Sequence, residues 1–436
     1  MKKPTTKTKT AKKSIEEICK TVEEPNYWGN PEYRMLSRDF FVLNDTHKTR
    51  LNNNDLIVGA AGRGKSTGYV EPLIDQMCSN MIISDTKNAL YRNHADKLRA
   101  AGYKVYNLDF SGSPESCSYN PLDFIGYDEE SDSYCQQDII TLAEQLCPGS
   151  LDNDKFWPMS AQILISALIA FILEATPEHE HNFGSLLKLF LEMDNIKTMD
   201  RIFSHHGMEN PKSFAYARYR MFKSVGSADR TFCSIMIFAA ASVSGFDCSD
   251  KAHVFNRKSS FTFEQLANEK TAVFLNTDDT DRSLDKIVNI FYSQAFNKLI
   301  KIADKTDEKR LAIPVRFILD DFATNTVIPY FSKLISVIRS REIYVSIILQ
   351  GINQLKEIYS EAEATTIICN CDHMLFLGAS DIETARYIGE KMNTPYYNIL
   401  NLPFDAAYLF EAGNPKGGMK VEKYIPDFSA MGKVVE

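Results

Sequence analysis

Residues 59–66 read Gly-Ala-Ala-Gly-Arg-Gly-Lys-Ser, which matches the pattern G-x-x-x-x-G-K-[ST] at every fixed position. An apolar run at 55–58 leads into this segment, and a helical pattern begins near Lys65. A strand, a glycine-rich turn and a helix in this order make a loop whose backbone N–H groups surround phosphate oxygens. A Cβ atom at Gly62 or Gly64 would block that approach. The alternative is a chance match in a glycine-rich turn, and the strand-then-helix context argues against it.

The phosphate loop predicts which residues bind the ligand. Lys65 is expected to reach the β- and γ-phosphates, and Ser66 is expected to hold Mg²⁺. The positive end of the following helix adds to the anion site. The expected ligands are therefore ATP and Mg²⁺. The predicted nucleotide-binding residues are Gly59, Gly62, Arg63, Gly64, Lys65, Ser66 and Thr67.

A second strand of the sheet is expected to end in acidic residues near the metal. The run 316–319 is followed by Asp320 and Asp321. Asp320 is predicted to lie in the Mg²⁺ shell, which leaves Asp321 to polarise the attacking water. The alternative is a pair of acids that cap a strand end in solvent.

Two further polar residues are candidates for the same site. The run 344–349 ends in Gln350, at the carboxyl edge where ligands of open α/β sheets bind, so Gln350 is either a γ-phosphate sensor or an ordinary loop amide. Arg339 and Arg341 are expected at the end of an amphipathic helix. In ring ATPases an arginine of the neighbouring subunit stabilises transition-state charge. Surface solvation explains each of these arginines equally well.

The whole chain predicts an α/β domain with a mostly parallel sheet, interrupted by an all-α insertion. Short apolar runs bounded by turn residues indicate buried strands at 56–58, 81–84, 104–108, 271–275, 315–319, 344–349 and 374–377. From residue 125 to about 245 the patterns are helical instead, as at 134–146, 156–173, 183–191 and 214–222. The predicted organisation is a basic arm and lead-in (1–50), a nucleotide-binding domain (51–125), an all-α domain (126–248), and the rest of the nucleotide-binding domain with a C-terminal tail (249–436).

Composition limits the function classes. With 49 Lys+Arg against 57 Asp+Glu the net charge is −8, so any DNA-binding surface must be local. The nine cysteines are odd in number and widely spread, which fits reduced thiols. Cys369, Cys371 and His373 alternate as on one face of a strand, but their spacing and the missing fourth ligand disfavour zinc.

The N-terminal segment and the apolar stretches bear on location. Residues 1–13 carry six lysines and are expected to form a solvated arm, or one that contacts anionic lipid or nucleic acid. They contain no apolar core of a secretory signal. The longest apolar stretch, 159–173, is expected to be too short for a membrane helix. These features predict a cytoplasmic protein with no transmembrane segment.

Several segments in one order resemble the type IV coupling proteins, the RecA-like hexameric ATPases of conjugative DNA transfer. The resemblance covers about residues 54–395. It implies a RecA-like P-loop NTPase domain, an all-α domain facing the cytosol, and a homo-hexameric ring that handles single-stranded DNA with its attached relaxase. Besides the phosphate loop, the matching segments are 84–87, 119–123, 156–157, 274–275, 318–323, 338–342, 348–350, 354–355 and 377–381.

The resemblance also assigns residues and exposes two departures. It places the trans-acting arginine on Arg339, the γ-phosphate glutamine on Gln350, and the metal and catalytic acids on Asp320 and Asp321. The family usually has Glu at the position of Asp321, so a shorter acid must come closer to the water and hydrolysis could be slow. Most members also carry N-terminal membrane helices, whereas about fifty soluble residues are expected here, so membrane attachment would need a separate partner.

The leading hypothesis is a DNA-stimulated ATPase that recruits relaxase-bound DNA and drives its transfer. Its expected partners are single-stranded DNA, the relaxase or relaxosome, and membrane components of a type IV secretion channel. Its expected location is the cytoplasm or the inner face of the cell membrane. Two alternatives are an adaptor that binds nucleotide without turnover and recruits relaxase or other protein cargo, and a DNA-translocating or packaging ATPase unconnected to conjugation.

Overall fold

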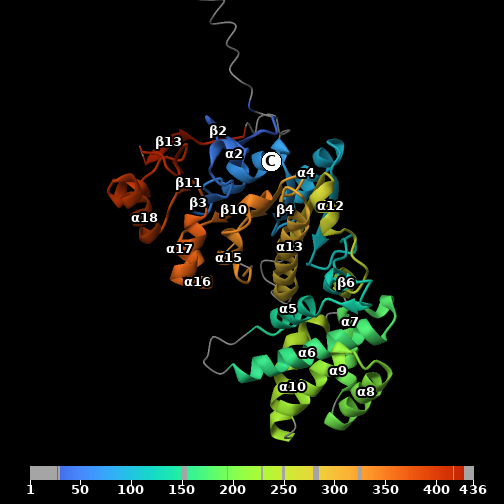
Figure 1. The fold of residues 1–436 in the computed structure, drawn as a ribbon. Coiled ribbons are helices and arrows are strands. Elements are labelled where there is room, and N and C mark those ends of the chain that lie inside the picture. Colours follow the sequence, from blue (N-terminus) through green and yellow to red (C-terminus); the bar gives the residue numbers. More distant parts are fainter. Residues whose placement is uncertain are drawn as a thin grey trace, which may run out of the picture.

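A large twisted sheet forms the centre of the molecule (Figure 1). The computed structural model describes residues 27, 30–148, 155–193, 195–226, 229–247, 251–277, 284–322, 327–415 and 417–426. Within these residues the main sheet has nine strands in the order β13-β12-β11-β3-β10-β9-β4-β8-β5. The seven strands predicted from the sequence are confirmed and all run parallel: β3 (Asp55–Gly59), β4 (Asn80–Ser84), β5 (Lys104–Asp109), β8 (Thr271–Asn276), β9 (Val315–Leu319), β10 (Ile343–Leu349) and β11 (His373–Gly378).

Six further strands within the described residues were not predicted: four lie in the main sheet or the lead-in, and the other two form a hairpin in the insertion. β12 (Ala406–Glu411) and β13 (Gly418–Glu422) extend the sheet antiparallel beyond β11. In the lead-in, β1 (Tyr33–Ser37) and β2 (Phe40–Leu43) pair as a hairpin. β1 and β13 are mixed in polarity, so they lack the continuous apolar run of a strand that is buried on both faces. β2 (Phe-Phe-Val-Leu) and most of β12 (Ala-Ala-Tyr-Leu-Phe-Glu) are apolar runs that the prediction overlooked.

Consecutive strand residues point to opposite faces of the sheet, so each face has its own core. Ile57 packs with α3 (Glu71–Gln76), α4 (Ala89–Ala100) and the β1–β2 hairpin, whereas Leu56 packs on the opposite face. That second face is covered by α13 (Asp285–Lys305), α15 (Phe331–Ile335), α16 (Asn353–Ile358), α17 (Glu361–Cys369) and α18 (Ile382–Met392).

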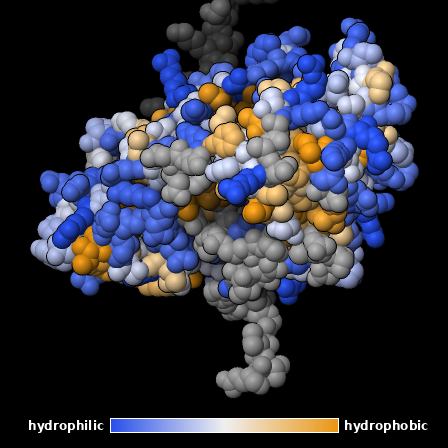
Figure 2. Space-filling model, turned by 90° about the horizontal axis from the view of Figure 1, so that it is seen from below, coloured by the Kyte–Doolittle hydropathy of each residue, from blue (hydrophilic) through white to orange (hydrophobic). Residues whose placement is uncertain are grey.

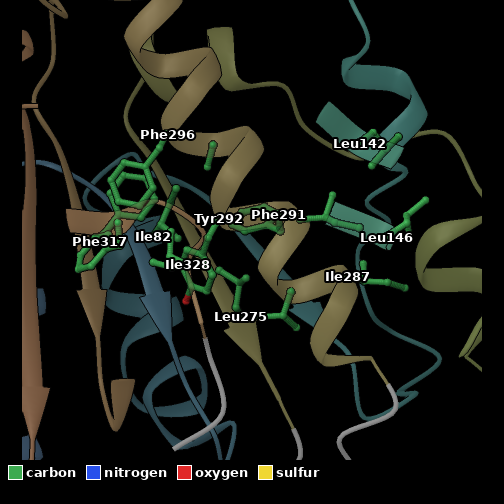
Figure 3. Packing of buried hydrophobic residues seen from close by; sticks show 14 of the residues in the cluster. Ile82, Leu142, Leu146, Leu275, Ile287, Phe291, Tyr292, Phe296, Phe317 and Ile328 are labelled. Carbon is green, nitrogen blue, oxygen red and sulfur yellow. The ribbon is translucent and has the colours of Figure 1, made fainter. Parts of the chain in front are cut away.

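Helix α13 connects the sheet to the helical insertion. Phe296 of α13 stacks on Phe317 of β9 with ring centroids 3.9 Å apart, and Leu142 and Leu146 lie on the other side of the helix (Figure 3). Lys298 and Lys301 of α13 pair with Asp138 of the insertion at 2.9 and 2.7 Å. Burial alone would raise the pKa of Asp138, but the hydrogen bonds and charges of the two lysines outweigh it and lower the pKa to about 2.

The insertion lies below the sheet in Figure 1. Its helices are α5 (Gln136–Leu146), α6 (Phe156–Ala175), α7 (Phe183–Glu192), α8 (Ile196–Glu209), α9 (Phe214–Val225) and α10 (Asp229–Val243). One detail of the prediction was wrong, because β6 (Tyr127–Asp128) and β7 (Ser133–Tyr134) form a short hairpin in a range expected to hold only helices. Two-residue strands carry no hydrophobic period that a sequence pattern can reveal.

The prediction that every apolar stretch is too short to cross a membrane was also wrong. Within the described residues, α6 is long and apolar enough by length and composition. It is the central helix of the insertion, and 67% of its apolar window is buried inside the protein. Burial of this kind is typical of a core helix in a folded domain. Viewed from below, the molecular surface is mostly hydrophilic with scattered hydrophobic patches (Figure 2).

The remaining elements are short. They are α2 (Thr46–Thr49), a π-helical turn (Ser66–Val70), α11 (Ala252–Phe255), α12 (Phe263–Asn268), α19 (Tyr396–Leu400) and the 3₁₀ turns Pro121–Phe124, Glu178–Glu180, Ser244–Asp247 and Arg339–Arg341. The basic arm predicted at 1–13 lies outside the described residues.

The predicted strand face of Cys369, Cys371 and His373 does not exist. Cys369 ends α17 and His373 begins β11. The His373 ring belongs instead to a buried ionic cluster, where its Nδ1 lies 3.0 Å from an Arg34 guanidinium nitrogen. Burial and the positive charge of Arg34 lower the pKa of His373 to about 3. Among the described residues no group of three or more His, Cys, Asp or Glu side chains is placed to hold a metal ion.

Asp55, at the start of β3, is the centre of this cluster. Arg34 of β1 donates to Asp55 through Nε and Nη2 at 2.9 and 2.8 Å, and Arg316 of β9 donates at 3.0 Å. Burial alone would raise the pKa of Asp55, but the two guanidinium groups lower it to about 2. The lead-in hairpin is thus fixed to the strand that carries the phosphate loop.

Candidate nucleotide-binding site

Three neighbouring strands deliver the predicted site residues to one edge of the sheet. β3 lies beside β10, and β10 lies beside β9, all parallel. Their carboxyl ends therefore meet at the same edge. β3 ends in the phosphate loop, β10 ends before Gln350, and β9 ends before Asp320.

The phosphate loop has the backbone that its glycines predict. Gly62 and Gly64 have φ angles of +73° and +75°, which residues with a Cβ rarely adopt. The loop is tied to the neighbouring strand, because the Ala60 N–H donates to the Gly378 carbonyl at 2.9 Å. Its first glycine is closely packed, since a Cβ at Gly59 would lie 3.0 Å from Leu377 Cβ. The sheet thus fixes the position of the start of the loop.

Ser66 and Asp320 meet across the site. The Ser66 hydroxyl donates to Asp320 Oδ2 at 3.0 Å, although the two residues are 254 positions apart in the chain. Burial, followed by the negative charge of Asp321, raises the pKa of Asp320 from 3.8 to about 6. A hydroxyl and a carboxylate that gains from a nearby positive charge are oxygen ligands suited to Mg²⁺. The residues present therefore fit a magnesium ion bound beside a nucleotide.

Lys65 and Asp321 complete the centre of the edge. Lys65 is buried, and its Nζ lies 3.4 Å from the Ala60 carbonyl of its own loop. Asp321 adopts a left-handed backbone with φ of +48°, and its N–H donates to Asp320 Oδ1 at 3.1 Å. Gln350 Nε2 lies 3.5 Å from Asp321 Oδ1, at the outer limit of a hydrogen bond. The two acids and the glutamine therefore form one cluster.

The other two predicted loop residues lie at the rim. Arg63 donates from Nη1 to the Leu402 carbonyl at 3.1 Å and covers Gly378, where a Cβ would lie 3.0 Å from Arg63 Nε. Thr67 lies close to the loop as well, because a Cβ added at Gly64 would lie 3.5 Å from Thr67 Oγ1. Arg63 thus connects the loop to the segment that follows α19.

The structure does not bring Arg339 to this cluster. It lies in a 3₁₀ turn rather than at the end of an amphipathic helix, and its Nη2 donates to the Arg50 carbonyl at 2.7 Å. The turn directly precedes β10, whereas Gln350 directly follows this seven-residue strand. At about 3.3 Å per residue, the strand separates Arg339 from the phosphate edge by roughly 20 Å. Arg339 therefore lies at the opposite edge of its own sheet.

Sequence reasoning missed the C-terminal contribution to the site. A Cβ added at Gly68 would lie 3.1 Å from the Tyr424 carbonyl oxygen. A Cβ added at Gly64 would lie 4.0 Å from Lys423 Cε. Both residues follow β13, a strand that the apolar pattern did not reveal. A lone lysine after a weak strand carries no motif by which it could have been found.

A parallel sheet with a phosphate loop after a central strand and a buried acid after a nearby strand defines the P-loop nucleotide-binding class. The family model described as type IV secretory system conjugative DNA transfer matches residues 3–394. The chain belongs to this family, and the resemblance noted in its sequence is confirmed.

Solved structures agree on the fold. The bacterial conjugative coupling protein TrwBdeltaN70 in its sulphate-bound trigonal form has a TM-score of 0.66 at 14% identity, with 86% of each chain covered. TrwB in complex with ADP and Mg²⁺ has a TM-score of 0.64 at 15% identity, again covering 86% of each chain. VirB4 of Thermoanaerobacter pseudethanolicus has a TM-score of 0.54 at 14% identity and covers 90% of this chain and 96% of its own. No curated protein matched the sequence. The RecA-like α/β fold with its all-α insertion is thus shown.

Proposed function

We propose that this protein is an ATP-hydrolysing coupling protein that recruits relaxase-bound DNA to a type IV secretion system and drives single-stranded DNA transfer. The observation that carries the proposal is the Ser66–Asp320 contact beside the phosphate loop, in a chain of the conjugative DNA transfer family. Nucleotide complexes of TrwB, including one with ADP and Mg²⁺, support ATP and Mg²⁺ as the ligands.

Each residue at the edge has a role that its position supports. The loop N–H groups and Lys65 would bind the phosphates, and Ser66 and Asp320 would hold Mg²⁺, which would supply positive charge to the transferred phosphoryl group. Asp321 would polarise the attacking water, and Gln350, whose Nε2 lies beside it, would sense the γ-phosphate. These groups are already gathered in the fold, so binding does not have to assemble them.

Arg339 is proposed to act on the nucleotide of a neighbouring copy. It lies at the far edge of its own sheet and is exposed, so it is presented outward. A ring of copies would set this edge against the phosphate edge of the next subunit, and the arginine would then stabilise transition-state charge. An exposed arginine at this edge is compatible with a contact between copies, and the homo-hexamer is proposed from the family resemblance.

The proposed location is the cytoplasm or the inner face of the membrane, and the proposed membrane partner is a component of the secretion channel. We also propose the domain division expected from the sequence, with boundaries near 50, 125 and 248. We propose that the insertion binds the cargo, because large apolar side chains such as Met159 and Ile237 are exposed on it.

Steady-state ATP hydrolysis tests the proposal. The purified protein and Lys65→Ala are assayed against increasing single-stranded DNA at low and moderate salt. Stimulation that weakens with salt and is absent in the variant is expected, because phosphate contacts release counterions. Hydrolysis by Lys65→Ala at the parental rate would refute the loop assignment.

A second function is an adaptor that binds nucleotide without turnover. It is favoured by Asp321, an acid one methylene shorter than Glu that is held in a left-handed backbone. Tight ATP binding with no turnover in both the parent and Asp321→Glu would select the adaptor. DNA-stimulated turnover in a protein encoded apart from conjugation genes would select the packaging alternative.

A further inference from the structure

The chain's C-terminal segment lies directly on the phosphate loop. The Tyr424 carbonyl approaches Gly68 so closely that a Cβ there would lie 3.1 Å away. Lys423 Cε lies 4.0 Å from the Cβ position of Gly64, beside Thr67. Ser66, by contrast, turns toward Asp320. The segment therefore occupies the end of the loop away from the proposed metal.

This segment is held in place from two sides. The Lys423 N–H donates to the Asp405 carbonyl at 3.1 Å. Glu422 is fixed to the turn of the β1–β2 hairpin, because its carbonyl accepts from the Arg38 N–H at 3.0 Å and its N–H donates to Asp39 Oδ1 at 3.1 Å. The position of Lys423 is thus a property of the folded core.

The Lys423 ammonium has surroundings that favour an additional anion. The residue is 5% exposed, and its Nζ donates to the neutral Phe404 carbonyl at 3.0 Å. Burial and the nearby positive charge of Arg63 lower its pKa to about 8, against the opposing effect of Asp405. A buried ammonium beside a second cation is stabilised when a phosphate comes close.

Phe404 presents an aromatic face beside this ammonium. The residue is 57% exposed, and Lys423 Nζ lies 4.5 Å from the centroid of its ring. Arg63 of the phosphate loop holds the same segment through the Leu402 carbonyl. An exposed aromatic ring next to a phosphate cradle offers a stacking surface that accepts any nucleobase.

We propose that Phe404 and Lys423 form the nucleoside side of the site, with the ring of Phe404 stacking on the base and Lys423 donating to the α-phosphate. The inference rests on the proposed nucleotide binding. Loop N–H groups of this motif hold the α- and β-phosphates while the motif lysine reaches the β- and γ-phosphates. Lys423, at the Thr67 and Gly68 end, therefore meets the α-phosphate.

Calorimetric titration with ADP and with inorganic tripolyphosphate tests the two roles separately. Phe404→Ala is expected to weaken ADP at least about fivefold and to leave tripolyphosphate unchanged, because stacking needs a base. Lys423→Met is expected to weaken both ligands about tenfold, and Lys423→Arg is expected to recover most of the loss. Lys420→Met, an exposed lysine of β13, is the matched control and should bind like the parent.

The outcomes separate this inference from the function on which it rests. If Lys65→Ala loses ADP while Phe404→Ala and Lys423→Met bind like the parent, the nucleoside site is refuted and nucleotide binding stands. If the parent binds neither ligand, both fail. Phe404 is largely exposed, so its variant is expected to fold, and a thermal melt of each variant checks this.

Discussion

Replacing Asp320 with Asn should stabilise the nucleotide-free protein while removing its response to magnesium. The structure raises the pKa of this carboxyl from 3.8 to about 6 through burial and the charge of Asp321. Each pKa unit corresponds to about 1.4 kcal/mol, so holding the ionised carboxylate costs about 3 kcal/mol. Asn has nearly the same shape and no charge, and its oxygen can still accept from the Ser66 hydroxyl. Its amide nitrogen cannot accept from the Asp321 N–H as the second carboxylate oxygen does, so about 3 kcal/mol is the upper bound of the gain.

The sign of the effect depends on pH. Because the folded-state pKa is raised, the stability that comes from protonating Asp320 is fully present below pH 3.8 and is lost as the pH rises through about 6. The parent and Asp320→Asn should therefore have similar melting temperatures near pH 4. Above pH 6 the variant should melt higher by up to about 6 °C, at roughly 2 °C per kcal/mol for a domain of about 250 residues.

Thermal melts from pH 4 to 8, with and without ADP and Mg²⁺, measure both effects. In the parent, magnesium should add to the stabilisation by ADP, since binding to the folded state shifts the equilibrium, and in the variant this addition should disappear. Asp307→Asn, which removes the same charge at an exposed position, is the control. A variant that melts at or below the parent at pH 7.5 without ligand, or a difference that does not change with pH, would refute the reasoning.

Three other substitutions probe the loop, the cluster beneath it and the far edge of the sheet. Gly64→Ala, at φ of +75°, should lower the free energy of unfolding by about 1–2 kcal/mol and weaken ADP binding in a titration. Gly413→Ala, at φ of +78° and with no atom within 4 Å of the added Cβ, is the control and should lower stability without changing ADP binding. Arg34→Met should lower stability by about 3–5 kcal/mol in urea unfolding, because it removes one partner of a buried charge, and an unchanged midpoint would contradict this. Arg339→Ala should bind ADP normally but hydrolyse ATP at least about tenfold more slowly. Mixing it with Lys65→Ala should restore part of the hydrolysis if the arginine acts between subunits, and no recovery would argue against that arrangement.

The parts of the fold that could be predicted are those with a strong local pattern. The central strands are buried on both faces, so their apolar runs are continuous, and β3 and β9 could be placed within one or two residues. The carboxyl-edge rule for parallel sheets then sufficed to gather Ser66, Asp320 and Gln350. Site residues that follow predictable strands can therefore be placed together from the sequence alone.

The rest could not be predicted because its information is not local. β13 has alternating burial and little apolar character, and Lys423 gains its significance only from Arg63 and Phe404, which reach it through folding. The pairing of Arg34 with Asp55 likewise depends on where the hairpin packs. The apolar length of α6 was underestimated because polar residues inside it were read as interruptions.

The order of strands also has a consequence for how the protein is made. β3 is synthesised early, but both of its neighbours, β10 and β11, come from the last third of the chain. The Ser66–Asp320 contact spans 254 residues, which at about 5–20 residues per second takes a ribosome roughly 13–50 s to produce. Throughout this interval an apolar strand has no partner on either edge, which makes the nascent chain a natural client for chaperones. A chain that lacks β11 also lacks the Gly378 carbonyl that holds the phosphate loop through the Ala60 N–H, so the loop gains its full support only once β11 has been made.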